Sequence, residues 1–168
     1  MDRLWTPWRY RYVSSAHPEG TDLKGGCIFC EKAASSEDRD NYIVLRAERN
    51  FLILNLYPYT TGHLMIVPYE HIATLAGAPQ DTLEEMMRLT ARAEKTLRQL
   101  YGPDGLNIGM NVGESAGAGI AGHIHMHVLP RWIGDGSFMT TVAETRVLPE
   151  TLETTYDRVK AALSATKS

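Results

Sequence analysis

The chain has 168 residues, of which 43% are hydrophobic and 22% charged, with a formal net charge of −3 at pH 7. This length and composition predict one soluble globular domain with a substantial core. The small negative charge argues against a nucleic-acid-binding surface, and no apolar run approaches the roughly 20 residues that a membrane span needs.

The first 26 residues form an aromatic and arginine-rich arm that leads into a loop. Trp5, Trp8, Tyr10 and Tyr12 are too apolar to stay in solvent, so we expect the arm to pack on the domain or on a partner subunit. It could be a hydrophobic latch or an arm that contacts substrate. It has no apolar stretch typical of a signal peptide, which favours a cytoplasmic location.

The two cysteines of the chain, Cys27 and Cys30, lie three positions apart at the start of a short helix expected over residues 27–36. Two cysteines cannot build a disulfide framework, and in a cytoplasmic chain this spacing is typical of a metal site or a redox pair. A tetrahedral zinc ion needs two more ligands, which histidines can supply. The alternative is a pair of reduced, buried cysteines.

Five segments rich in β-branched and apolar side chains predict strands. They are residues 42–45, 51–56, 63–68, 106–111 and 123–130. Because short links join the first three, we expect these to pair antiparallel, the first two as a hairpin.

Two segments repeat apolar residues at helical spacing. Residues 81–101 predict a long helix that stops at Gly102, with Met86 and Met87 in the core, and residues 150–163 predict a terminal helix. The segment between residues 131 and 148 is expected to be mostly irregular. A sheet of about five antiparallel strands with two main helices is an α+β fold.

Half of the six histidines alternate along one expected strand, as His123, His125 and His127. Successive side chains of a strand point to opposite faces, so the imidazoles would share one face while Ile124, Met126 and Val128 face the core. The glycine-rich residues 111–122 can bring backbone amides close to an anion. Together they suit the binding and attack of a phosphate, although the row could also be a solvated face, a metal site or an accidental cluster.

These motifs resemble the histidine triad (HIT) family of nucleotide hydrolases and transferases. Residues 123–129 match the family signature of histidines alternating with hydrophobic residues. Residues 55–68 resemble the family's strand, turn and strand, and residues 111–119 its phosphate loop.

The resemblance covers residues 27–135 as a HIT domain, between the arm of residues 1–26 and a C-terminal extension with a helix, residues 136–168. Outside the motifs, residues 4–10, 130–135 and 146–150 resemble the branch that contains bacterial diadenosine tetraphosphate phosphorylases.

The resemblance and the central place of His125 in the row indicate that this residue is the nucleophile, which forms a nucleotidyl-histidine intermediate. His127 would donate a proton to a phosphate oxygen or to the leaving group, with His123 as the third member of the triad. Asn55, expected at the ribose, could instead only flank a turn, and Asn111 could cap a loop. The implied nucleotide contacts are Asn55, Asn111, Ser115, Gly117, Ala118, Gly119, His125, His127 and Trp132.

The resemblance also implies a structural zinc ion bound by Cys27, Cys30, His71 and His123, which would anchor the first triad residue beside the nucleophile. We further expect His63 to hydrogen-bond the triad from behind. The implied function is cleavage of dinucleoside polyphosphates, diadenosine tetraphosphate first, by a homodimer that binds neither nucleic acid nor membrane.

The motifs do not distinguish phosphate from water as the acceptor of the nucleotidyl group in the second step. Only the resemblance to the phosphorylase branch favours phosphate. A nucleoside phosphoramidate hydrolase and a non-catalytic, zinc-stabilised adenine-nucleotide-binding protein are the alternative functions.

Overall fold

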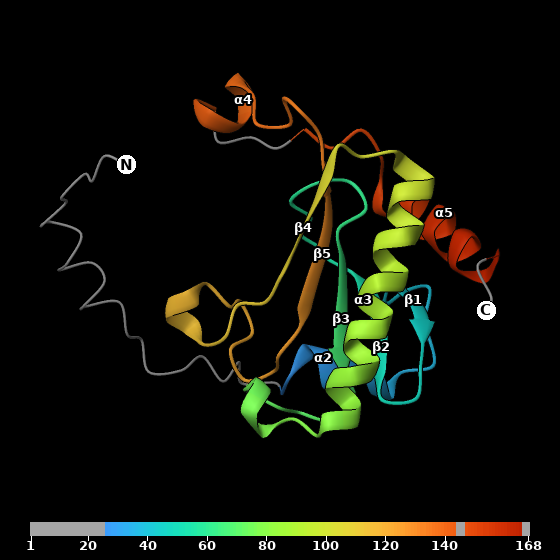
Figure 1. Cartoon of the computed structure of the whole chain (residues 1–168), viewed down its shortest axis with the longest axis vertical. Helices are drawn as coiled ribbons and strands as arrows, with labels where there is room; N and C mark the ends of the chain where they lie inside the picture. The colour runs from blue at the N-terminus through green and yellow to red at the C-terminus, as the bar shows by residue number, and fades with distance from the viewer. Residues whose placement is uncertain (1–25, 144–146, 166–168) are drawn as a thin grey trace, which may run out of the picture.

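The computed structural model describes residues 26–143 and 147–165, which form a five-stranded sheet with helices on both faces (Figure 1). The N-terminal arm, with its four aromatic residues, lies outside the described residues, and its role stays a prediction. None of the described helices combines the length and apolarity needed to cross a lipid bilayer.

The sheet has the strand order β1-β2-β3-β5-β4, and every neighbouring pair is antiparallel. The predicted antiparallel sheet of five strands is therefore confirmed. Its strands are β1 (Ile43–Arg46), β2 (Asn50–Leu54), β3 (Leu64–Pro68), β4 (Gly105–Gly109) and β5 (Met126–Arg131).

The last strand begins later than predicted, at Met126 rather than at His123. The reason lies in the pairing of the preceding residues, because the Ile124 amide donates to the Ile72 carbonyl at 2.7 Å instead of joining the β3 ladder. His123 and His125 therefore lie on the segment that leads into β5, and only His127 lies within the strand.

Two main helices are present, as predicted. They are α3 (Gln80–Tyr101), which ends at Gly102 in the left-handed conformation, and α5 (Leu152–Ala165). The shorter helices are α2 (Ile28–Ala34), α4 (Phe138–Thr141), and the 3₁₀ turns η1 (Leu75–Gly77) and η2 (Glu114–Ala116).

The hydrophobic core has two parts, one on each face of the sheet. On one face α3 packs against β2, β3, β5 and α5, and α5 also packs against β1 (Figure 1). Met86 is buried there, but the prediction for Met87 was wrong, since its side chain is 57% exposed. Adjacent positions on a helix point about 100° apart, which turns Met87 away from the sheet.

The opposite face carries a smaller apolar cluster, in which Phe29 of α2 packs with side chains of the first three strands. The strand members of this cluster are Ile43, Phe51, Ile53, Met65 and Val67. The histidines of the row lie on this second face, beside α2.

Candidate active site

The imidazoles of His125 and His127 lie side by side at the start of β5, with ring centroids 4.9 Å apart. On the opposite face Ile124 and Val128 are buried in the core against α3. The predicted alternation of imidazole and core side chains is confirmed, even though the first two histidines precede the strand.

His125 is held in one tautomer by the main chain. Its Nδ1 lies 2.9 Å from the carbonyl oxygen of His123, and since a carbonyl only accepts, Nδ1 carries the proton. Burial lowers the pKa of His125, although the bond to the carbonyl partly opposes this shift. The ring is therefore neutral near pH 7, with the lone pair on Nε2, as a nucleophile requires.

A hydrogen bond from His63 holds His127 in the opposite tautomer. The expected hydrogen bond between His63 and the triad is therefore confirmed. His63 Nδ1 accepts from the Tyr59 backbone amide at 3.2 Å and lies 3.3 Å from the side-chain nitrogen Nδ2 of Asn55. Because both neighbours are donors, Nδ1 carries no proton. His63 Nε2–H then donates to His127 Nδ1 at 2.9 Å. This leaves the proton of a neutral His127 on Nε2.

The protonation state of His127 agrees with its surroundings. Burial, together with the neighbouring His125, lowers the pKa of His127 to about 4. At neutral pH both imidazoles are uncharged, one with a lone pair and the other with a proton on Nε2. One can attack a phosphorus while the other donates to an oxygen.

Both rings line a cavity of about 290 Å³ between α2, the turn after β2 and the glycine-rich loop. Its volume is at the small end of ligand pockets. Five of the predicted contacts line it, namely Asn55, Gly117, Gly119, His125 and His127. Sequence reasoning missed its other walls, which include Ile28, Phe29, Lys32, Tyr57, Tyr59, Met65 and Ile120.

The glycine-rich loop uses several of its polar groups internally. The amides of Gly117 and Ala118 donate to the carbonyls of Glu114 and Gly113, at 2.8 and 3.4 Å, and the Asn111 side chain donates to the Gly117 carbonyl at 3.4 Å. Ser115 is exposed in η2 and, like Ala118, is not among the residues that line the cavity. Gly119 lines it, and its amide donates to no other described residue.

Asn55 both flanks the turn and faces the cavity. Its Oδ1 accepts from the Tyr57 amide at 2.9 Å, while the side chain lines the cavity. Trp132 lies elsewhere, in a neighbouring hollow of about 290 Å³ that shares only Tyr59 with the histidine cavity. Its ring meets Tyr101 edge to face, with the centroids 6.5 Å apart.

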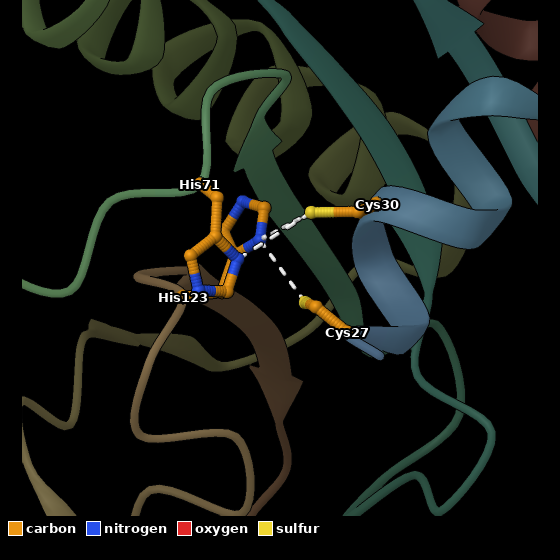
Figure 2. A group of neighbouring side chains, drawn as sticks. All are labelled: Cys27, Cys30, His71 and His123. Carbon is orange, nitrogen blue, oxygen red and sulfur yellow. Dashed lines mark hydrogen bonds between the residues drawn. The ribbon is translucent and has the colours of Figure 1, made fainter. Parts of the chain in front are cut away.

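The side chains of Cys27, Cys30, His71 and His123 converge on one point, as Figure 2 shows. The cysteines come from the start of α2, His71 from the loop after β3, and His123 from the segment before β5. Their ligand atoms all lie within 4.8 Å of one another.

The geometry of this cluster fits a tetrahedral zinc ion. Zn–S and Zn–N bonds of about 2.3 and 2.05 Å place a sulfur and a nitrogen about 3.6 Å apart in one tetrahedron. The Nδ1 atom of His123 lies 3.3 Å from Cys27 Sγ and 3.6 Å from Cys30 Sγ, and that of His71 lies 3.4 Å from Cys30 Sγ. His123 Nε2 donates to the Pro68 carbonyl at 2.9 Å, which directs the Nδ1 lone pair toward the sulfurs.

Phe29 connects the cysteine pair to the histidine row. It lies between the two cysteines, and its ring centroid is 5.4 Å from that of His123 and 5.1 Å from that of His125. The sequence does carry a signal for Phe29, namely its place between Cys27 and Cys30. A residue between two ligands of one metal ion is held close to that ion.

A family model described as the HIT domain matches residues 36–132 of the chain. This match covers more than half of the sequence, so the chain belongs to the histidine triad family of nucleotide-processing proteins.

Among its relatives is a protein of Mycobacterium tuberculosis named AP-4-A phosphorylase, which is 35% identical over 92% of this chain and 80% of that protein. A zinc-bound histidine triad family protein from Mycobacterium smegmatis has a similar structure. It has a TM-score of 0.67 and 30% identity, over 83% of this chain and 94% of that one. A histidine triad nucleotide-binding protein from Sulfolobus tokodaii matches with a TM-score of 0.64 and 26% identity, over 83% of this chain and 93% of that one.

Proposed function

We propose that this protein cleaves dinucleoside polyphosphates, diadenosine tetraphosphate among them, through a nucleotidyl intermediate on His125. The observation that carries the proposal is the bond from His125 Nδ1 to the His123 carbonyl, which leaves the Nε2 lone pair for the cavity. The similarity to the mycobacterial AP-4-A phosphorylase supports this choice of substrate and favours phosphate as the acceptor.

In the first step His125 Nε2 attacks the α-phosphorus, a P–N bond forms, and the bond to the bridging oxygen of the leaving polyphosphate breaks. His127 donates a hydrogen bond from its Nε2–H to that oxygen, so the polyphosphate leaves as an anion, and His63 Nε2–H keeps its hydrogen bond to His127 Nδ1 throughout. The Gly119 amide stabilises the nonbridging oxygens. The bond from His125 Nδ1 to the main chain persists throughout.

In the second step the acceptor attacks the phosphorus and the P–N bond breaks, which returns the lone pair to His125. Phosphate as acceptor turns diadenosine tetraphosphate into ATP and ADP, whereas water yields ATP and AMP. The remaining contacts belong to the same proposal: Asn55 binds the ribose hydroxyls, and Asn111, Ser115, Gly117, Ala118 and Trp132 contact the rest of the nucleotide.

The zinc ion would be structural, since four protein ligands leave it no open position. When bound it would fix the start of α2 against the segment that carries His123 and His125. We further propose a cytoplasmic homodimer that binds no nucleic acid or membrane, with residues 27–135 as its HIT domain, residues 1–26 as an arm and residues 136–168 as an extension.

The proposal is tested by incubating the protein with diadenosine tetraphosphate, with and without phosphate, and separating the products. ATP with ADP, formed only when phosphate is present, is the expected result. AMP formation would identify a hydrolase instead. Nucleotide binding without any product would identify a non-catalytic protein, and cleavage of a nucleoside phosphoramidate alone would identify the phosphoramidate hydrolase.

A further inference from the structure

One charged residue lies in the otherwise apolar wall that α2 contributes to the histidine cavity. Ile28 and Lys32 are four positions apart, so they share one face of α2, and both line the cavity. Among the described lining residues Lys32 is the only lysine or arginine, and no carboxylate accompanies it.

The Lys32 ammonium is partly fixed and only partly satisfied. Its Nζ donates to the Asn41 carbonyl at 3.2 Å, and within the described part of the chain it forms no ion pair with a carboxylate. An ammonium has three N–H groups, so two remain for another acceptor.

The position of Lys32 in the cavity indicates which part of a nucleotide it would meet. His125 and His127 mark the phosphate end, and Asn55 marks the ribose. The base must then lie against the apolar wall formed by α2 and β2, which includes Phe29 and Ile53. Lys32 lies on this wall, one helical turn beyond Ile28.

We propose that Lys32 donates to the O6 and N7 atoms of guanine, and so favours guanine over adenine in the nucleotide that His125 receives. Guanine presents two acceptors on this edge, whereas adenine presents one acceptor and an amino donor that repels a cation. The inference rests on the proposed function for the orientation of the nucleotide, and it names the base preferred at that same site.

The test compares the binding of guanosine and adenosine 5′-monophosphates to the wild type and to Lys32→Met by titration calorimetry. Methionine keeps the unbranched stem that lines the cavity and removes the donors. We expect the dissociation constant for the guanine nucleotide to rise about tenfold, with a change below about twofold for the adenine nucleotide. Lys32→Arg, which keeps two donors, should preserve the preference.

Lys95→Met on the exposed face of α3 removes the same charge from the other side of the sheet, and it should leave both constants unchanged. An equal loss of affinity for both nucleotides would assign Lys32 to the phosphates and overturn the inference. Unchanged affinity of Lys32→Met for both nucleotides would also overturn the inference.

Binding and turnover together separate this inference from the proposed function. If Lys32→Met changes the binding ratio but the wild type cleaves neither diguanosine nor diadenosine tetraphosphate, the proposed function fails and the inference holds. If the wild type cleaves both while the binding ratio is the same in wild type and variant, the inference fails alone.

Discussion

The position of the proton on the His127 ring is set by groups that are distant in the sequence. The Tyr59 amide donates to one nitrogen of His63, and the other nitrogen of His63 donates to His127. A neutral imidazole has one donor and one acceptor nitrogen, so the bond from Tyr59 fixes the tautomer of His63, and the bond from His63 fixes that of His127. The proposed hydrogen bond from His127 Nε2–H to the leaving group therefore depends on His63, which directly precedes β3.

Replacing His63 with phenylalanine should lower kcat by about 10- to 100-fold, which is less than the roughly 10²- to 10⁴-fold contributed by a positioned acid–base group itself, and leave KM within about twofold. The reason is that His127 loses the donor that fixes its tautomer. His63→Gln, whose amide can donate to His127 Nδ1, should recover much of the rate. Steady-state kinetics of all three proteins check this prediction, and equal rates for glutamine and phenylalanine would refute a positioning role.

At the scale of elements, the β1–β2 turn depends on a helix from elsewhere in the chain. The buried carboxylate of Glu85 on α3 accepts from the amides of Glu48, Arg49 and Asn50, at 3.2, 2.8 and 2.8 Å, and from the Asn50 side chain at 2.9 Å. These bonds satisfy three backbone donors that the hairpin itself leaves unpaired.

Glu85→Gln should lower the free energy of unfolding by about 2 kcal/mol, because it weakens these bonds and turns an amide donor toward backbone donors. Glu84→Gln, at an exposed position one residue away, is the matched control and should change stability by less than about 0.5 kcal/mol. Urea unfolding of the two variants measures the difference. Equal stabilities would show that the carboxylate does not support the turn.

The same carboxylate predicts a dependence of stability on pH. Burial raises the pKa of Glu85, but the hydrogen bonds from Asn50, Arg49 and Glu48 outweigh it and hold the pKa below the usual 4.5. A folded-state pKa below the unfolded one gives stability that is complete above pH 4.5 and is lost as the pH falls through the folded value. Stability should therefore decline less steeply with acid in Glu85→Gln than in the wild type.

The elements that sequence could predict are those with a local signal. Runs of β-branched and apolar residues located the five strands of the described part of the chain, and helical periodicity located both main helices. The start of β5 was misplaced because its pairing depends on the bond from Ile124 to Ile72, which the local pattern does not encode. The cavity walls from Phe29, Lys32 and Ile120 were missed for a similar reason, since tertiary packing of α2 and the loop brings them to the histidines.

At the scale of the whole molecule, the proposed zinc ion would join three segments that are far apart in the sequence. It would hold the start of α2, the loop after β3 and the segment before β5 together (Figure 2). Phe29 lies between the two cysteines in the sequence and contacts the His125 ring, so the metal would also position the proposed nucleophile.

Cys30→Ser should therefore lose zinc, as elemental analysis would show, and should lower both stability and kcat. A loss of about 2 kcal/mol corresponds to a fall in Tm of roughly 4–8 °C for a domain of this size. Glu31→Gln, on the same turn of α2 but not a ligand, is the control. A zinc-free wild type with unchanged Tm and kcat would exclude a structural metal.

The central claim is that His125 Nε2 becomes covalently bonded to the α-phosphorus during turnover. It is tested by mixing the protein with diadenosine tetraphosphate in the absence of phosphate, quenching in alkali to preserve the P–N bond, and mapping the modified peptide by mass spectrometry. We predict one adenylyl group on His125, absent from His125→Ala and discharged to ADP when phosphate is added before the quench. Turnover by His125→Ala at the wild-type rate, or an adenylyl group on another residue, would contradict the account.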